Sequence, residues 1–220
     1  MRLLLAAVTA ALALAAPAQA AAVSWTDAFE RLDAARWTQS PHVLGRGLLD
    51  PANATVSDGL LHLGLPAGRF DGAEVFTRTL FRSGRFAARM KVPDAPGSIS
   101  AVFLYAPPDL GQELDIEIFN ERTGRVWVTA YAGGRQTQHA ELDLGFDPTA
   151  GLHTYEIRWT RKEMAFSADG RILRRWRTGV PRNPMRLYLN AWWPAWLSGA
   201  QLTTPASADA DWVAVSGDAV

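Results

Sequence analysis

Cysteine is absent from the sequence, so disulfide bonds contribute nothing to the stability of this protein. A chain of 220 residues can bury enough apolar surface to fold without them. An excess of one charge is absent as well, because 22 Lys and Arg residues balance 22 Asp and Glu residues. We therefore expect no nucleic-acid partner, and no long-range attraction to an acidic or basic polymer.

Long apolar runs are missing beyond the first twenty residues. The one such run, Leu3 to Ala16, follows the single charge of Arg2 and precedes the small-residue site Ala18-Gln19-Ala20. This arrangement predicts a secretory signal peptide over residues 1–20, cleaved near Ala20. The run is too short to cross a membrane, which takes about 20 apolar residues. We expect a secreted or periplasmic monomer with no membrane partner, in which residues 21–220 form one domain.

Histidine is scarce, and its distribution argues against a metal centre. The four histidines, His42, His62, His139 and His153, are too scattered along the chain to match the ligand spacing of a known metal site. We therefore predict no catalytic metal.

The pattern of apolar residues beyond residue 20 is that of a β-protein. Short runs alternate between polar and apolar residues, as in 85–92, and Asp-Gly pairs at 58–59 and 169–170 are typical of hairpin turns. No stretch keeps the 3.6-residue apolar period of a long helix. Many short antiparallel strands predict an all-β fold, a two-sheet sandwich of the jelly-roll type.

One segment, Glu113 to Phe119, alternates acids and aliphatics strictly. Residues two apart on a strand share a face, so Glu113, Asp115 and Glu117 project from one side and the aliphatic residues enter the core. An ordinary half-exposed strand is the alternative interpretation. Three acids about 6.6 Å apart repel one another, however, and such a cost is usually offset by a function.

The spacing of the two glutamates suggests which function. Their Cα atoms lie about 13 Å apart on a strand, so side chains that lean inward bring the carboxyl groups to about 5 to 6 Å, the separation typical of retaining glycosidases. At that separation the two charges repel by about 3 kcal/mol, enough to raise the pKa of one carboxyl by about two. One glutamate could thus stay protonated as an acid while the other acts as a nucleophile.

The segment Glu113-Leu114-Asp115-Ile116-Glu117 resembles the active-site signature of glycoside hydrolase family 16, in the form found in lichenases and xyloglucan-active enzymes. The resemblance extends from about residue 70 to 215, through segments 103–105, 144–147, 151–155, 168–170 and 190–192. It implies a jelly roll with a substrate cleft across its concave sheet. It also implies that Glu113 is the nucleophile, Glu117 the acid/base, and Asp115 the carboxylate that orients and tunes them, whereas the spacing alone leaves the two glutamate roles interchangeable.

Aromatic and amide residues extend this candidate site. Pairing Glu117 with Trp127 and Glu113 with Tyr131 in a hairpin would place aromatic rings beside the acids. Aromatic faces stack on glucose rings and amides hold hydroxyl groups, so we expect these and similar residues to bind sugar; core packing, or a solvent-facing acid in the case of Glu74, is the alternative. The substrate-binding candidates are Glu74, Phe103, Tyr105, Tyr131, Asn190 and Trp192. The cluster Trp192 to Trp196 either extends the cleft or closes one end of the sandwich.

Three departures from the lichenase pattern concern the substrate. Gly111-Gln112 stands where lichenases have Trp-Asp, Phe76 replaces an Arg of the cleft, and Thr129 replaces an Asn. A flatter or wider subsite follows, so the substrate is expected to be a β-glucan or a related exopolysaccharide. The sequence thus predicts a lichenase-like retaining endo-β-glucanase that needs no cofactor, although the resemblance allows a structural Ca²⁺. A transglycosylase with the same residues and a non-catalytic β-glucan-binding lectin remain alternatives.

Overall fold

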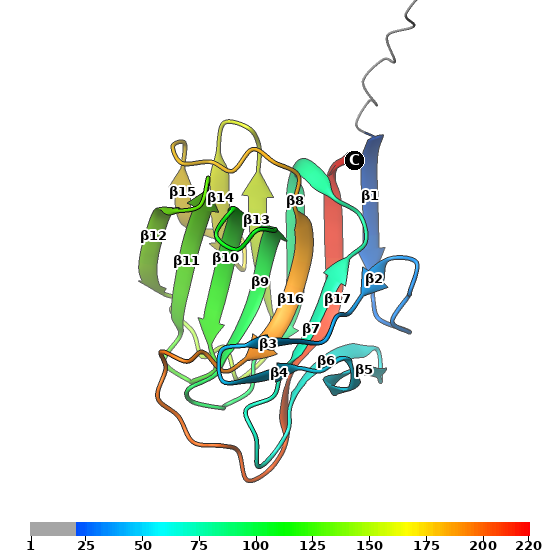
Figure 1. Ribbon diagram of the computed structural model, residues 1–220, viewed down its shortest axis with the longest axis vertical. Helices are drawn as coiled ribbons and strands as arrows, with labels where there is room; N and C mark the ends of the chain where they lie inside the picture. Colours follow the sequence, from blue (N-terminus) through cyan, green and yellow to red (C-terminus); the bar gives the residue numbers. More distant parts are fainter. Residues whose placement is uncertain (1–20) are drawn as a thin grey trace, which may run out of the picture.

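Two antiparallel sheets packed face to face form the fold in the computed structural model, which describes residues 21–220 (Figure 1). The predicted signal peptide lies outside the described residues. The front sheet has the strand order β12-β11-β10-β9-β16-β7-β2, and the back sheet has the order β15-β14-β13-β8-β17-β6-β5, with β1 paired to β17. The predicted all-β jelly-roll sandwich is therefore confirmed.

The strands account for most of the described residues. The front sheet comprises β2 (Trp37–Thr38), β7 (Ala73–Thr77), β9 (Ile99–Ala106), β10 (Gln112–Phe119), β11 (Arg125–Ala132), β12 (Gln136–Asp143) and β16 (Arg186–Trp192). The back sheet comprises β1 (Ala21–Asp27), β5 (Ala54–Ser57), β6 (Leu60–Leu65), β8 (Phe81–Lys91), β13 (His153–Trp159), β14 (Met164–Ala168), β15 (Arg171–Trp176) and β17 (Ala206–Ala219). A separate hairpin consists of β3 (His42–Leu44) and β4 (Gly47–Leu49), and a short 3₁₀ helix, η1, spans Pro51–Asn53. Among residues 21–220, no helix is long and apolar enough to cross a membrane.

Alternation along each strand separates the core from the outer faces of the sheets. On β10, Leu114, Ile116 and Ile118 are fully buried between the sheets, and on β16 the same is true of Leu187 and Leu189. Large side chains from the back sheet, among them those of Phe86, Tyr155, Trp159 and Phe166, complete a single hydrophobic cluster. The intervening polar and aromatic residues of β10 and β16 thereby reach the outer face of the front sheet.

Both predicted Asp-Gly turns are two-residue hairpin connections. Asp58 and Gly59 join β5 to β6 with φ angles of 53° and 72°, and Asp169 and Gly170 join β14 to β15 with 47° and 76°. Positive φ at both positions is the signature of a type I′ turn, whose twist matches that of the flanking strands. The local sequence therefore fixes these two hairpins.

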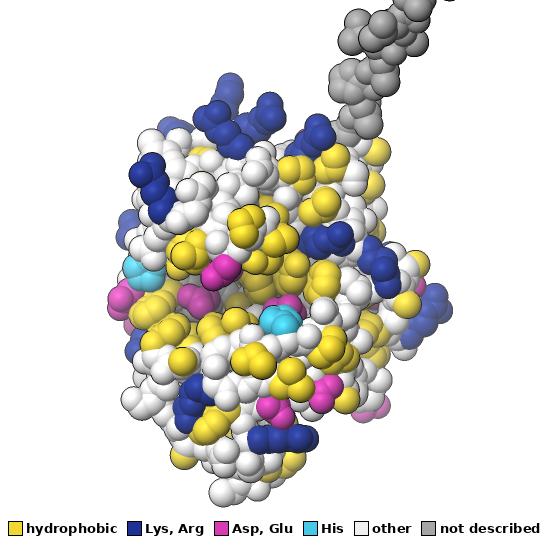
Figure 2. Space-filling view, viewed as in Figure 1, with side chains coloured by type: hydrophobic (Ala, Val, Ile, Leu, Met, Phe, Trp, Pro, Cys, Tyr) yellow, Lys and Arg dark blue, Asp and Glu magenta, His cyan; other side chains and the backbone are white. Residues whose placement is uncertain are grey.

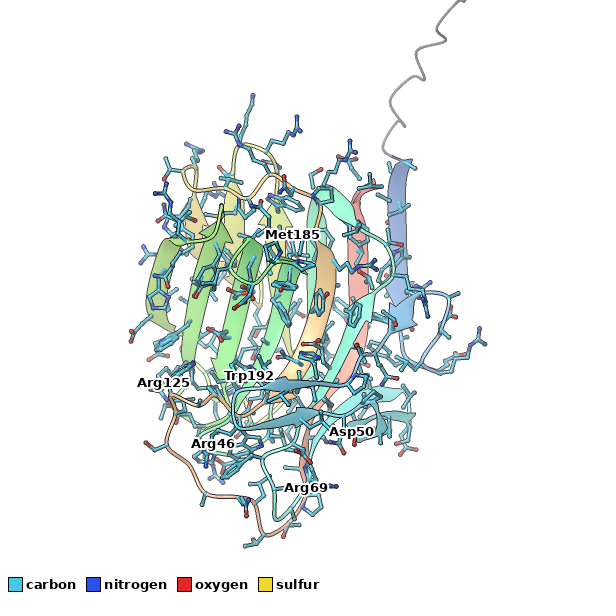
Figure 3. The ribbon with its side chains drawn as sticks, viewed as in Figure 1. Arg46, Asp50, Arg69, Arg125, Met185 and Trp192 are labelled. Carbon is cyan, nitrogen blue, oxygen red and sulfur yellow. The ribbon has the colours of Figure 1, made fainter. Side chains whose placement is uncertain are left out.

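The β3–β4 hairpin crosses the lower ends of β16 and β7 in front of the sheet (Figure 3). Its turn is held there by backbone contacts, since the Arg46 N–H donates to the carbonyl of Trp193 at 2.9 Å. Gly45 has φ of 60°, and a Cβ at this position would lie 2.9 Å from the Trp192 ring. The Arg46 guanidinium also donates to the carbonyl of Gly199 and stacks over the Phe70 ring. These contacts bring the hairpin against Trp192, at one end of the outer face.

Candidate active site

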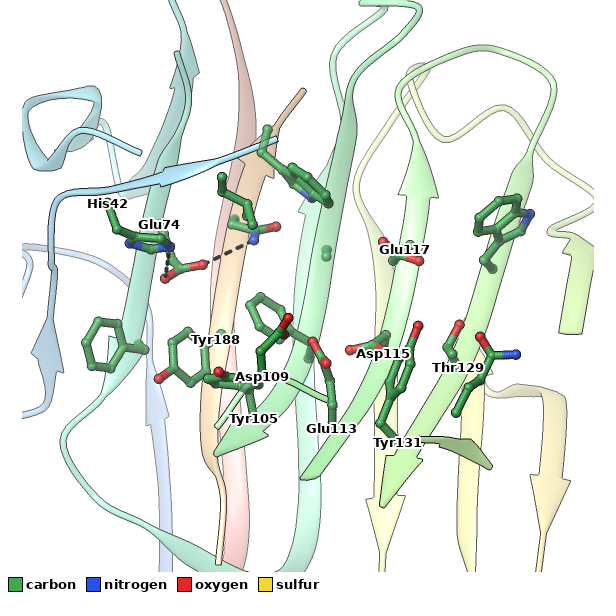
Figure 4. A pocket seen from close by; sticks show the side chains of 18 of the residues that line it. His42, Glu74, Tyr105, Asp109, Glu113, Asp115, Glu117, Thr129, Tyr131 and Tyr188 are labelled. Carbon is green, nitrogen blue, oxygen red and sulfur yellow. Dashed lines mark hydrogen bonds and ion pairs between the residues drawn. The ribbon is translucent and has the colours of Figure 1, made fainter. Parts of the chain in front are cut away.

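The strand β10 lies between β9 and β11 in the front sheet and carries the three acids. Glu113 pairs with Tyr131 of β11, and Glu117 pairs with Trp127 of the same strand. Both predicted pairings are confirmed. Glu113, Asp115 and Glu117 project side by side from the outer face of the sheet (Figure 4). The regular register along β10 is what keeps them on one face.

A cleft of about 730 Å³ crosses this face. Figure 2 shows it as a hollow with hydrophobic side chains on its floor and acidic groups among them. The cleft brings together all nine residues that the sequence indicates, which are Glu74, Phe103, Tyr105, Glu113, Asp115, Glu117, Tyr131, Asn190 and Trp192. The acids therefore share a space large enough for several sugar units with the predicted stacking and amide groups.

Burial controls the protonation of the three acids. Loss of solvent raises the pKa of Glu113 to about 7 and that of Glu117 to about 7, and it raises the pKa of Asp115 well above its usual range. Repulsion among the carboxylates adds to the effect at Glu113 and Asp115. Repulsion, which the spacing of the acids predicts as the cause, is thus the smaller contribution to the raised pKa of Glu113, and burial is the larger one. A protonated glutamate near neutral pH follows from either cause.

Replacing Glu117 by glutamine should stabilise the fold at alkaline pH. Below pH 4.5 the carboxyl is protonated in the folded and the unfolded chain, but as pH rises to about 7 only the unfolded chain ionises it freely, so folding stability is lost. The amide of Glu117→Gln never ionises. We expect thermal unfolding to show a melting temperature about 4 to 8 °C above that of the wild type at pH 8, from about 2 kcal/mol, and little difference at pH 4.5. An equal gain at both pH values would contradict this account, and Glu30→Gln, which changes an exposed residue, serves as control.

A second buried carboxyl lies at the other side of the cleft. Glu74 of β7 accepts a hydrogen bond from the Asn190 amide at 3.2 Å, and His42 Nε2 of β3 lies 3.9 Å from its other oxygen (Figure 4). Burial raises the pKa of Glu74 to about 7, although His42 and the Asn190 hydrogen bond oppose the increase. The Oδ1 atom of Asn190 is buried without a hydrogen-bond partner among the described residues. The side-chain amide of Asn190 can therefore accept a hydrogen bond from a sugar hydroxyl through Oδ1 and donate one through its second N–H.

Aromatic rings form the apolar part of the cleft. The ring of Tyr188 stacks between those of Phe76 and Phe103, with centroid separations of 4.7 and 4.9 Å. At the opposite side, the ring of Trp127 stacks on that of Trp196, with a centroid separation of 4.8 Å and an angle of 7° between the ring planes. These flat faces suit the apolar sides of sugar rings.

The tryptophan cluster divides between the two roles that the sequence left open. Trp192 and Trp196 line the cleft, and Trp196 keeps 51% of its surface exposed. Trp193 is fully buried in the core beside Phe70. Trp192 is the last residue of β16, and Trp193 follows directly after it.

Three of the positions that depart from the lichenase pattern, Phe76, Thr129 and Gln112, make side-chain contacts. Phe76 stacks on Tyr188, and Thr129 Oγ1 lies 3.0 Å from Nδ1 of His139. Gln112 Oε1 accepts hydrogen bonds from the backbone N–H groups of Arg182 and Asn183 at 2.8 and 3.1 Å. The last contact ties the beginning of β10 to the loop before β16.

Several residues of the cleft were not singled out by sequence reasoning. They are Ser40, His42, Val43, Leu44, Ala101, Asp109, Gln136 and His139, of which the two histidines had been considered only as metal ligands. Ser40, His42, Val43 and Leu44 arrive through the β3–β4 hairpin and the segment before it, and Asp109 arrives on the loop between β9 and β10, so neither group belongs to a periodic pattern. Gln136 and His139 lie on β12, where they could have been found by extending the pairing from β11.

No group of three or more His, Asp or Glu side chains in residues 21–220 is arranged to hold a metal ion. The three β10 acids are lined up along one strand rather than around a common centre.

Comparison with known protein families matches residues 48–214 to the model described as glycosyl hydrolases family 16. The chain is 29% identical over 187 residues to a xylanase/beta-glucanase of Ruminococcus flavefaciens, covering 76% of this chain but 23% of that protein. It is 29% identical over 167 residues to a beta-glucanase of Paenibacillus macerans, covering 71% of this chain and 70% of that protein. A third relative, xyloglucan endotransglucosylase/hydrolase protein 22 of Arabidopsis thaliana, is 30% identical over 145 residues, covering 60% of this chain and 50% of that protein.

Solved structures share the architecture. The Bacillus licheniformis beta-glucanase superposes with a TM-score of 0.80 at 24% identity, covering 87% of this chain and 97% of that one. At this identity the likeness establishes a shared fold.

Proposed function

Because the chain belongs to glycosyl hydrolase family 16, we propose that it is a retaining endo-β-glucanase that cleaves internal bonds of a β-glucan or a related exopolysaccharide. The observation that carries the proposal is the row of three acids on β10 at the floor of the cleft, with Glu113 and Glu117 on either side of Asp115. Their raised pKa values allow one glutamate to be protonated and the other ionised near neutral pH.

The proposed reaction has two displacements. The Glu113 carboxylate attacks the anomeric carbon as the glycosidic bond breaks, and Glu117 gives its proton to the departing sugar oxygen. Glu117 then takes a proton from water, which attacks the same carbon and releases Glu113. Consuming the Glu113 charge in an ester removes its repulsion from Glu117 and so lowers the pKa of Glu117 between the steps. The order of the two roles follows the family resemblance.

Neighbouring groups support these steps. Asp115, between the glutamates, hydrogen-bonds to Glu113 and lowers the pKa of that carboxyl, which favours the ionised nucleophile. Tyr131 lies beside Glu113, and burial raises the pKa of its hydroxyl to about 12, so it stays a neutral hydrogen-bond donor. In the proposed complex, Glu74 and Asn190 bind sugar hydroxyls and Trp192 stacks on a ring, which is supported by the Asn190–Glu74 hydrogen bond and by the position of all three in the lining of the cleft.

The decisive experiment is product analysis with a panel of purified β-glucans, including a mixed-linkage and a β-1,3-linked polymer. We expect NMR to show the β-anomer as the first product, because two displacements at one carbon restore its configuration. Internal cleavage should lower the viscosity of the polymer well before small sugars accumulate. Initial release of the α-anomer would overturn retention, and no cleavage of any polymer in the panel would overturn the glucanase assignment.

Transglycosylation is the second candidate, favoured by the likeness to the Arabidopsis thaliana endotransglucosylase/hydrolase. It uses the same glycosyl ester but passes the sugar to another hydroxyl instead of water. Adding a labelled acceptor oligosaccharide to the same reactions separates the two outcomes. If the products are mainly lengthened acceptors, the protein is a transglycosylase rather than a hydrolase.

A further inference from the structure

The balanced total charge conceals a strongly basic segment. Residues 158–186 contain nine Lys and Arg residues but two Asp and Glu residues, whereas the rest of residues 21–220 contains 12 and 20 respectively. This segment includes the β14–β15 hairpin and the loop that leads to β16. Dark-blue side chains gather along the upper edge of the molecule, above the cleft, in Figure 2.

Part of this basic surface is hollow. A cavity of about 440 Å³, here called the arginine hollow, is lined by the four arginines Arg135, Arg161, Arg177 and Arg182 and by residues 132, 137 and 178–180. Arg177 donates to Glu163 at 2.9 Å. The guanidinium groups of Arg135, Arg161 and Arg182 make no hydrogen bond or ion pair with any described residue. Three cationic groups thus face one space with their donors free.

The walls of the arginine hollow are fixed to the front sheet. Thr137 Oγ1 of β12 donates to the carbonyl of Gly179 at 2.7 Å. The two segments approach so closely that a Cβ on Gly179 would lie 2.6 Å from the Cβ of Thr137. The Gln138 amide reaches Thr178 Oγ1 at 3.0 Å. At the other end of the loop, Gln112 accepts the N–H groups of Arg182 and Asn183. The backbone of the loop that carries Arg177 and Arg182 is therefore fixed to β10 and β12, while the guanidinium group of Arg182 itself has no partner among the described residues.

The arginine hollow and the cleft share a wall but differ in charge. Tyr131 and Gln136 line the cleft, whereas Ala132, Arg135 and Thr137 line the hollow, so the turn between β11 and β12 separates the two. The lining of the cleft includes five carboxyl groups and no Lys or Arg. An anionic sugar would be repelled inside the cleft, yet an anionic group on a sugar that passes the β11–β12 turn would meet the guanidinium groups.

We propose that the arginine hollow binds a carboxylate or sulfate substituent carried by the polysaccharide where the chain leaves the cleft past Gln136. The planar fork of a guanidinium matches either group with paired hydrogen bonds. This inference rests on the proposed function, since it takes the cleft as the place where the same chain is cut. It makes the natural substrate a glucan-like chain that is neutral where it is cleaved and bears acidic groups nearby.

The test uses three preparations of one mixed-linkage β-glucan: the neutral parent, a lightly carboxymethylated form and a lightly sulfated form. The variant is Arg135→Gln/Arg182→Gln, and the matched control is Arg31→Gln/Arg82→Gln, which changes two exposed arginines outside the hollow. The readout is the ratio of kcat/KM on a charged form to kcat/KM on the parent. We expect this ratio to be about fivefold lower in the variant for one charged form at low salt, because the variant loses two exposed ion pairs with the polymer. The difference should vanish in concentrated NaCl, and the form with the larger effect identifies the anion.

Affinity electrophoresis through gels containing the same polymers measures binding without cleavage. We expect a charged polymer to retard the wild type more than the variant, relative to polymer-free gels. If no polymer is cleaved but this difference holds, the proposed function fails, whereas the binding of the acidic group by the arginine hollow stands. If cleavage occurs but the wild type and the variant show the same kcat/KM ratio and the same retardation, the inference is overturned. It is also overturned if the substitutions weaken only the binding to anionic phosphatidylglycerol vesicles.

Discussion

Glu113→Ala should lower kcat on the polysaccharide by at least about 10⁴-fold, because the covalent step loses its nucleophile. The side chain lies on the floor of the cleft, opposite Tyr105 on one side and Tyr131 on the other, so its removal leaves the sheet register unchanged. It also removes a buried carboxyl of raised pKa, so the variant should fold at least as well as the wild type. The measurement is the rate of new reducing ends on the best polymer of the panel, together with the melting temperature.

A small anion should restore activity to this variant. The space vacated by the carboxymethylene group admits azide, which can attack the anomeric carbon of a dinitrophenyl β-glucoside oligosaccharide as the phenolate departs. One displacement inverts the configuration, so the expected product is an α-glycosyl azide. Glu30→Ala, which alters an exposed residue outside the cleft, should behave as the wild type. A Glu113→Ala variant with wild-type activity would contradict the nucleophile assignment and the hydrolase mechanism together.

Local sequence was sufficient to predict the three acids of β10 and the pairing of β10 with β11. Period-two alternation places Glu113, Asp115 and Glu117 on one face of any strand, whatever the rest of the fold. The short connection between β10 and β11 then limits the register of that pair. The Asp-Gly turns were predictable for the same reason, since residue type alone favours positive φ at both positions.

The rest of the site depends on contacts between distant parts of the chain. Strand β16 lies between β9 and β7, and this order brings Asn190 to Glu74 across 116 residues of sequence. His42 reaches the same carboxyl because the β3–β4 hairpin packs against Trp192, a tertiary contact without a local pattern. Burial is likewise a property of the assembled sheet, which is why repulsion was overestimated as the cause of the raised pKa of Glu113. The balanced net charge gave no indication of the arginine hollow, because the basic excess of residues 158–186 is cancelled by an acidic excess elsewhere.

Glu117→Ala should separate substrates according to their leaving group. On the polysaccharide, the departing sugar oxygen needs the proton of Glu117, so kcat should fall by about 10² to 10⁴-fold. On a dinitrophenyl β-glucoside oligosaccharide, the phenolate leaves without a proton, so Glu113 still forms the ester at a rate near that of the wild type. Breakdown of the ester is then slow, because the base that activates water is missing. Stopped-flow absorbance should show a burst of one dinitrophenolate per enzyme molecule followed by slow turnover.

Azide identifies which glutamate has which role. In Glu117→Ala it attacks the glycosyl ester on Glu113 without needing a base, so turnover should rise and the product should be a β-glycosyl azide, formed by two inversions. In Glu113→Ala the single inversion gives the α-product, and the pair of variants therefore acts as its own control. An α-azide from Glu117→Ala together with a β-azide from Glu113→Ala would exchange the two roles while leaving the retaining mechanism intact. A loss of activity in Glu117→Ala that is equal for both kinds of leaving group would show instead that Glu117 does not act as the general acid, since only proton donation depends on the leaving group in this way.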